Sequence, residues 1–128
     1  ELFHGYTYSG HPLACAAGIA TLETYKQEKL FERAKGLEKY FGDRAHSLSR
    51  LNTVTDIRNI GLVAGVELTE RSKNPKTLGR DVFEKCFEKG VMVRFTGNTI
   101  ALSPPLIVRK SQIDEIFSIL EESIKESF

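Results

Sequence analysis

Long apolar runs are missing from this sequence, although 41% of its 128 residues are hydrophobic. No run approaches the roughly 18 residues that a membrane-spanning helix needs, so we expect no membrane segment. An excess of one charge is missing too, because 18 lysines and arginines are balanced by 17 aspartates and glutamates. This balance provides neither a basic tract for nucleic acid nor an acidic tail. The length suffices for one domain with a hydrophobic core.

Cysteine and histidine are also scarce. The two cysteines are Cys15 and Cys86, and the three histidines are His4, His11 and His46. Their spacing matches no common pattern of metal ligands, so we expect no metal site. Apolar neighbours surround both cysteines, which predicts core thiols in a reducing compartment. A cytoplasmic location is therefore expected.

Apolar residues recur every three or four positions in four segments, which predicts helices. The first should run from 12 to about 28, with Pro12 in its first turn and Ser9 or His11 as its cap. The others are expected at about 30–48, at 78–87 with Gly90 just past the end, and at 111–124. A capping box of Ser111 and Asp114 is expected to begin the last helix.

Four further segments have the composition of strands: 54–58, 62–68, 91–95 and 99–103. The pair Gly97-Asn98 predicts a hairpin turn between the last two, and the polar segment 69–76 should be a surface loop. The order helix, helix, strands, helix, hairpin, helix predicts an α+β fold. Its small antiparallel sheet should have helices packed on one face.

The segment 3–12 is rich in hydroxyl groups and glycines and directly precedes the first helix. Such a loop offers donors beside the positive end of a helix, which is how proteins hold an anion such as phosphate. Within the helix, Ala14, Gly18 and Leu22 recur at intervals of four and give a nearly smooth side. Another element could therefore pack closely against it.

Four blocks together resemble the C-terminal part of the class III aminotransferases, pyridoxal-phosphate enzymes of fold type I. The blocks are 3–12 (FHGYTYSGHP), 56–68 (DIRNIGLVAGVEL), 93–95 (VRF) and 103–106 (SPPL). The match is closest to the omega-amino acid–pyruvate (beta-alanine–pyruvate) branch, because Asn59 follows Arg58 where much of class III has glycine. The chain starts at Glu1 in mid-motif, so we expect it to be part of a longer protein.

The resemblance implies two binding residues. Thr7 matches the threonine whose hydroxyl and amide bind the phosphate of pyridoxal 5'-phosphate in the neighbouring subunit of a homodimer. Arg94 matches the arginine of the small domain that binds the substrate carboxylate. The resemblance also divides the chain into the phosphate loop and interdomain helix (1–28) and the C-terminal small domain (29–128).

Elementary chemistry permits both roles. Thr7 beside a helix start can supply two donors to a phosphate, and a planar guanidinium suits a carboxylate better than an ammonium does. Arg94 is out of phase with Val93 and Phe95, so it should leave the sheet on the face opposite these apolar side chains. Without the family resemblance, the sequence indicates only solvent-exposed surface residues at both positions. Arg58 reads as structural and paired with a carboxylate or a helix end.

No catalytic residue is expected within the chain. In this family the lysine that holds the cofactor as a Schiff base precedes the first block, and the lysines present here lie in polar helix faces or loops. We therefore expect the chain alone neither to bind the cofactor tightly nor to catalyse a reaction.

The expected activity of the intact protein is transfer of an amino group from an omega-amino acid or amine to pyruvate. Three alternatives stay open at this point. The first is another class III activity, with ornithine, 4-aminobutyrate or diaminononanoate as the amino donor, or an aminomutase reaction. The second is a non-catalytic α+β ligand-binding or regulatory module. The third is a structural unit that associates with itself through the smooth side around Gly18.

Overall fold

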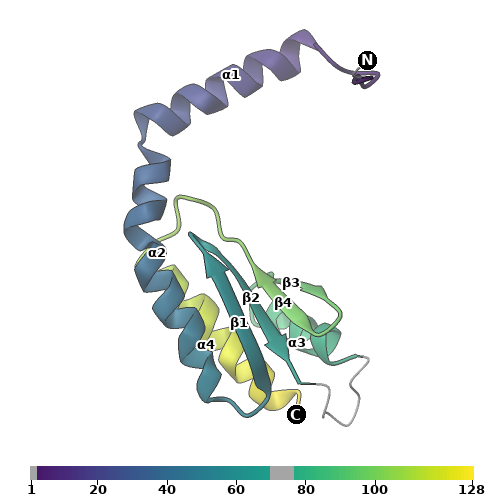
Figure 1. Ribbon diagram of the computed structural model, residues 1–128, viewed down its shortest axis with the longest axis vertical. Coiled ribbons are helices and arrows are strands. Elements are labelled where there is room, and N and C mark those ends of the chain that lie inside the picture. The colour runs from purple at the N-terminus through teal and green to yellow at the C-terminus, as the bar shows by residue number, and fades with distance from the viewer. Residues whose placement is uncertain (1–2, 70–76) are drawn as a thin grey trace.

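A computed structural model describes residues 3–69 and 77–128 (Figure 1). Two long helices begin the chain, four strands and a third helix follow, and a fourth helix ends it. The elements are α1 (Pro12–Gln27), α2 (Leu30–His46), the 3-10 turn η1 (Ser47–Arg50), β1 (Val54–Ile60), β2 (Val63–Leu68), α3 (Leu78–Glu88), β3 (Arg94–Thr96), β4 (Thr99–Leu102) and α4 (Lys110–Glu126).

The four strands form one antiparallel sheet in the order β1-β2-β4-β3. Both hairpin turns need a left-handed backbone, and glycine supplies it at Gly61 (φ 54°) and Gly97 (φ 56°). Helices α2, α3 and α4 cover one side of this sheet (Figure 1). The α+β architecture, with helices on one face of a small antiparallel sheet, is therefore confirmed.

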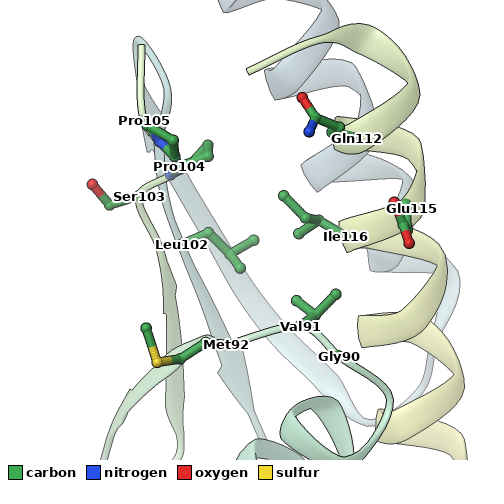
Figure 2. Close-up of a pocket in the computed structure, with 10 residues that line it drawn as sticks. All are labelled: Gly90, Val91, Met92, Leu102, Ser103, Pro104, Pro105, Gln112, Glu115 and Ile116. Carbon is green, nitrogen blue, oxygen red and sulfur yellow. The ribbon is translucent and has the colours of Figure 1, made fainter. Parts of the chain in front are cut away.

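Alternation along the strands continues into the extended segments next to them and divides buried from exposed side chains. Figure 2 shows Val91 and Leu102 directed toward Ile116 of α4, whereas Met92 and Ser103 point away from that helix. Val91 and Leu102 are 9% and 4% exposed, and Met92 is 80% exposed. A pocket of about 370 Å³ lies between these segments and α4, on the helix side of the sheet.

The core fills the space between the sheet and its helices. The rings of Phe41 in α2 and Phe117 in α4 meet edge to face with their centroids 5.2 Å apart, and both are almost fully buried. Val66 of β2 and Ile100 of β4 close this space from the sheet side. Buried apolar area of this kind is the main favourable term in folding.

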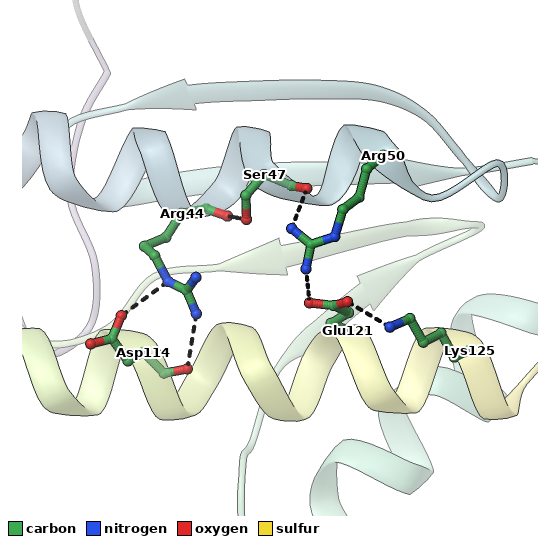
Figure 3. Close-up of polar contacts among 6 residues, drawn as sticks. All are labelled: Arg44, Ser47, Arg50, Asp114, Glu121 and Lys125. Carbon is green, nitrogen blue, oxygen red and sulfur yellow. Dashed lines mark hydrogen bonds and ion pairs between the residues drawn. The ribbon is translucent and has the colours of Figure 1, made fainter.

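Charged side chains join α2 and η1 to α4 at the rim of the core (Figure 3). Arg44 pairs with Asp114, Nε to Oδ1, at 3.0 Å, and Arg50 donates a hydrogen bond to Glu121. Glu121 also accepts a hydrogen bond from Lys125 of its own helix at 2.7 Å. Lys125 and Arg50 together lower the pKa of the Glu121 carboxyl below its usual value. These partly exposed pairs orient the two helices more than they stabilise them.

Helix α1 projects beyond the rest of the domain (Figure 1), and none of its residues is buried. Lys29, in a left-handed conformation (φ 51°), separates it from α2. At its start the His11 ring accepts a hydrogen bond from the backbone N–H of Ala14 at 3.4 Å, so the expected His11 cap is confirmed.

Several local expectations need correction. Cys86 is buried as predicted, and burial raises the pKa of its thiol. The core prediction for Cys15 is wrong, because the exposed helix α1 carries it away from the sheet. The last helix begins one residue before Ser111, and its first-turn hydrogen bond runs from the Arg109 N–H to the side chain of Gln112 (3.0 Å).

Strand limits differ slightly from those expected. β1 continues to Ile60, and β3 begins only at Arg94. Gly90, at φ 88°, follows α3 as predicted. Of the loop expected at 69–76, all but Thr69 lies outside the described residues. Among the described helices, none is long and apolar enough to cross a membrane, and no three potential metal ligands gather in the described part.

Candidate functional site

The side of the sheet turned away from α2, α3 and α4 is called the open face below. Side chains that point to it alternate with buried core residues in β2 and β4, and the strand register gives the corresponding positions in β1 and β3. Its members are Asp56, Arg58, Ile60, Val63, Gly65, Glu67, Arg94, Thr96, Thr99 and Ala101.

Arg94 stands at the edge of this face, on β3. Its neighbours Val93 and Phe95 point to the helix side, where Phe95 meets the ring of Phe83 in α3 at 5.4 Å. The Arg94 side chain is exposed, and it makes no hydrogen bond or ion pair with another described residue. The predicted face of Arg94 is confirmed, and within the described part of the chain nothing occupies its guanidinium.

One cross-strand row of the open face links all four strands. Arg94 lies opposite Ala101, Ala101 opposite Gly65, and Gly65 opposite Arg58. Residues directly opposite each other in an antiparallel sheet share a face. The row therefore has a guanidinium at each end and a floor of two small residues between them.

Arg58 differs from Arg94 in being paired. Its Nη1 donates to both Glu67 (2.9 Å) and Asp56, and these two carboxylates, Glu67 foremost, raise the pKa of the guanidinium. The expected structural pairing of Arg58 with a carboxylate is thus confirmed. The particular partner Glu67 was missed, because it is specified by strand register; only the Asp56–Arg58 alternation was visible in the sequence.

Thr7 lies at the other end of the chain, in the turn that precedes α1. This turn is closed by hydrogen bonds from the backbone N–H of Tyr6 to the Ser9 hydroxyl and from the Ser9 N–H to the Tyr6 carbonyl, both 2.9 Å. Gly10 then takes a left-handed conformation (φ 75°). Thr7 is exposed, and no hydrogen bond between its hydroxyl and another described residue is formed.

The two predicted binding residues are not brought together within one chain. The segment before α1 lies at the far end of that helix from the sheet that carries Arg94 (Figure 1). The Thr7 turn and the open face are therefore separate groups of exposed donors.

Comparison with known proteins gives consistent matches over nearly the whole chain. Residues 1–124 match the family model of class III aminotransferases. An omega-aminotransferase of Caulobacter vibrioides is 59% identical over 91% of this chain and 26% of its own length. A beta-alanine–pyruvate aminotransferase of Pseudomonas aeruginosa is 34% identical over 97% of this chain and 28% of its own length.

A solved structure supports the same relationship. The adenosylmethionine-8-amino-7-oxononanoate aminotransferase of Methanocaldococcus jannaschii superimposes with a TM-score of 0.88 at 37% identity, over 98% of this chain and 30% of that one. The chain thus spans about a quarter to a third of the length of these relatives. With this agreement of sequence and fold, the chain belongs to the class III aminotransferase family.

Proposed function

We propose that this chain is the C-terminal part of a pyridoxal-phosphate-dependent aminotransferase that moves an amino group from an omega-amino acid or amine to pyruvate. The observation that carries the proposal is Arg94, exposed on the open face and without an ion pair to any other described residue. Its planar guanidinium can hold a carboxylate with two parallel hydrogen bonds. The 59% identical omega-aminotransferase and the beta-alanine–pyruvate aminotransferase support this choice of substrates.

Thr7 is proposed to bind the cofactor phosphate of the neighbouring subunit in a homodimer. Its donors fit a phosphate, because an exposed hydroxyl and a nearby helix start are the groups such an anion prefers. They would form only part of a site. The distance between the Thr7 turn and the sheet within one chain favours binding across two subunits.

The cofactor, when bound, supplies the electron sink that lets an amino group leave one carbon and join another. Its covalent attachment needs a lysine of lowered pKa, which a desolvated site provides. Among the described residues no lysine is buried, and Lys89 has a raised pKa because of its partners Glu122 and Glu126. We therefore propose that the rest of the longer protein supplies this lysine, and that the chain alone is inactive.

The same proposal includes the division of labour along the chain. Residues 1–28 would form the phosphate loop and interdomain helix, and 29–128 the small domain. The exposed apolar side chains Leu13, Ile19 and Leu22 of α1 favour coverage of this helix by other parts of the protein. The free thiols of Cys15 and Cys86 suit the proposed cytoplasmic location.

A panel of amino donors tests the proposed reaction. The full-length protein, supplied with pyridoxal 5'-phosphate, should convert beta-alanine and simple amines with pyruvate faster than with 2-oxoglutarate. Ornithine, 4-aminobutyrate and diaminononanoate should be poorer donors. Faster turnover with 2-oxoglutarate would assign the protein to another branch of the family, and absence of any transamination would support a non-catalytic module.

Replacing Thr7 with alanine should weaken cofactor retention about ten-fold or more, since a hydrogen bond to a charged group is removed. The measurement is the dissociation constant of pyridoxal 5'-phosphate, followed by its absorbance after dialysis of the full-length protein. Thr21→Ala is a matched control, because the Thr21 hydroxyl donates to the Ala17 carbonyl within α1 (2.8 Å) and to no other described residue. Equal retention in the Thr7 variant and the wild type would contradict the phosphate role.

A further inference from the structure

The open face carries two arginines and two carboxylates in neighbouring rows. Arg94 and Arg58 end one row, and the adjacent row holds Glu67 and Asp56 beside two threonines. The formal charges of this group of four cancel. Which cation holds the carboxylates therefore decides which cation is left free.

The pairing is one-sided. Arg58 binds both Glu67 and Asp56, whereas Arg94 makes no ion pair among the described residues. The Arg58 side chain lies across position 65, where a Cβ would stand at van der Waals distance, 4.0 Å, from Arg58 Nη2. The Arg58 guanidinium thus reaches along β2 toward Glu67, over a position that has no side chain.

Glu67 would have a second possible partner without Arg58. It stands two strands and two residues away from Arg94, so strand spacings put their Cα atoms about 12 Å apart. An extended glutamate and an extended arginine can span that separation. Only Thr99 and Ala101 lie between them on β4. A carboxylate released on this face would therefore be drawn to Arg94.

We propose that Arg58 is a positioning residue for Arg94: by holding both carboxylates of the open face, it keeps the Arg94 guanidinium free for the substrate carboxylate. This inference rests on the proposed substrate-binding role of Arg94. Arg58 itself contacts no substrate. It acts by preventing an internal carboxylate from competing for Arg94.

A purely structural role of Arg58 predicts a different outcome. The side chains of Arg58, Asp56 and Glu67 are 58%, 50% and 45% exposed, and exposed ion pairs contribute little to stability. Loss of such a pair would lower stability slightly and affect every substrate alike. Selective weakening of carboxylate substrates separates the two roles.

The experiment uses the full-length, cofactor-loaded protein with beta-alanine as the carboxylate donor and propylamine as the carboxyl-free donor. Arg58→Met should raise KM for beta-alanine about ten-fold and change KM for propylamine less than two-fold. Arg80→Met is the matched control: Arg80 is also exposed and paired with one carboxylate, Glu84 at 2.7 Å, but it lies on α3. It should leave both KM values near those of the wild type.

Rescue variants test the mechanism of competition. Adding Glu67→Gln to Arg58→Met removes the competing carboxylate and should restore KM for beta-alanine to within about two-fold of the wild type. A crystal structure of the single variant gives a readout that does not depend on activity. It should show the Glu67 carboxylate within ion-pair distance of the Arg94 guanidinium.

Arg94→Met in the same assay separates the two levels of the proposal. If Arg94→Met raises KM for beta-alanine selectively while Arg58→Met does not, the inference about Arg58 is overturned and the proposed function stands. The inference is equally overturned if Glu67→Gln gives no rescue. If Arg94→Met raises KM equally for beta-alanine and propylamine, the proposed function is wrong, and the proposed role of Arg58 is wrong as well.

Discussion

Replacement of Arg94 by methionine should lower kcat/KM for beta-alanine about a hundred-fold or more, because two hydrogen bonds between charged groups are lost. The value for propylamine, which has no carboxylate, should stay within about two-fold of the wild type. The expectation follows from the exposed guanidinium on β3, which has no ion pair in the described part of the chain. Steady-state kinetics of the full-length protein with pyruvate as acceptor measures both values.

A conservative variant makes this prediction sharper. Arg94→Lys retains the positive charge but loses the planar fork that holds both carboxylate oxygens. Its kcat/KM for beta-alanine should lie between those of the wild type and Arg94→Met. Equal losses of kcat/KM for beta-alanine and propylamine would show that Arg94 supports the fold or the cofactor site and does not bind the carboxylate.

Replacement of Gly79 by alanine should destabilise the domain by about 3 kcal/mol, at the upper end of the usual cost of overpacking. Gly79 is buried in the first turn of α3, and a Cβ there would lie 2.1 Å from the carbonyl oxygen of Gly97. That oxygen belongs to the backbone of the β3–β4 turn, so no rotamer change can relieve the clash. Either α3 or the hairpin that carries Arg94 must shift.

Gly36→Ala is the control for this variant. Gly36 is exposed in α2, and a Cβ there would meet no atom within 4 Å. Alanine should therefore stabilise the helix by about 0.5–1 kcal/mol, as expected for glycine in a helix interior. Urea unfolding of the 128-residue chain measures both free energies. A Gly79→Ala variant as stable as Gly36→Ala would show that the close contact is not maintained in solution.

Local patterns were enough to predict much of this protein. The 3.6-residue periodicity that includes Leu37 and Phe41 predicted α2, and the pair Gly97-Asn98 predicted the hairpin turn. The face of Arg94 followed from the alternation of strand side chains. Each of these depends on residues close together in the sequence, where backbone geometry is the controlling factor. The family resemblance added the roles of Thr7 and Arg94, which stay predictions.

Only the tertiary structure decided how distant segments meet. The row from Arg94 to Arg58 depends on the register of three strand pairs, and the middle pair, β2 with β4, joins segments far apart in the sequence, so no turn between them fixes its register. The close approach of Gly79 to Gly97 depends on how α3 packs against the hairpin. Cys15 has apolar neighbours in the sequence, as core residues do, yet it is exposed. Burial requires a packing partner as well as an apolar sequence.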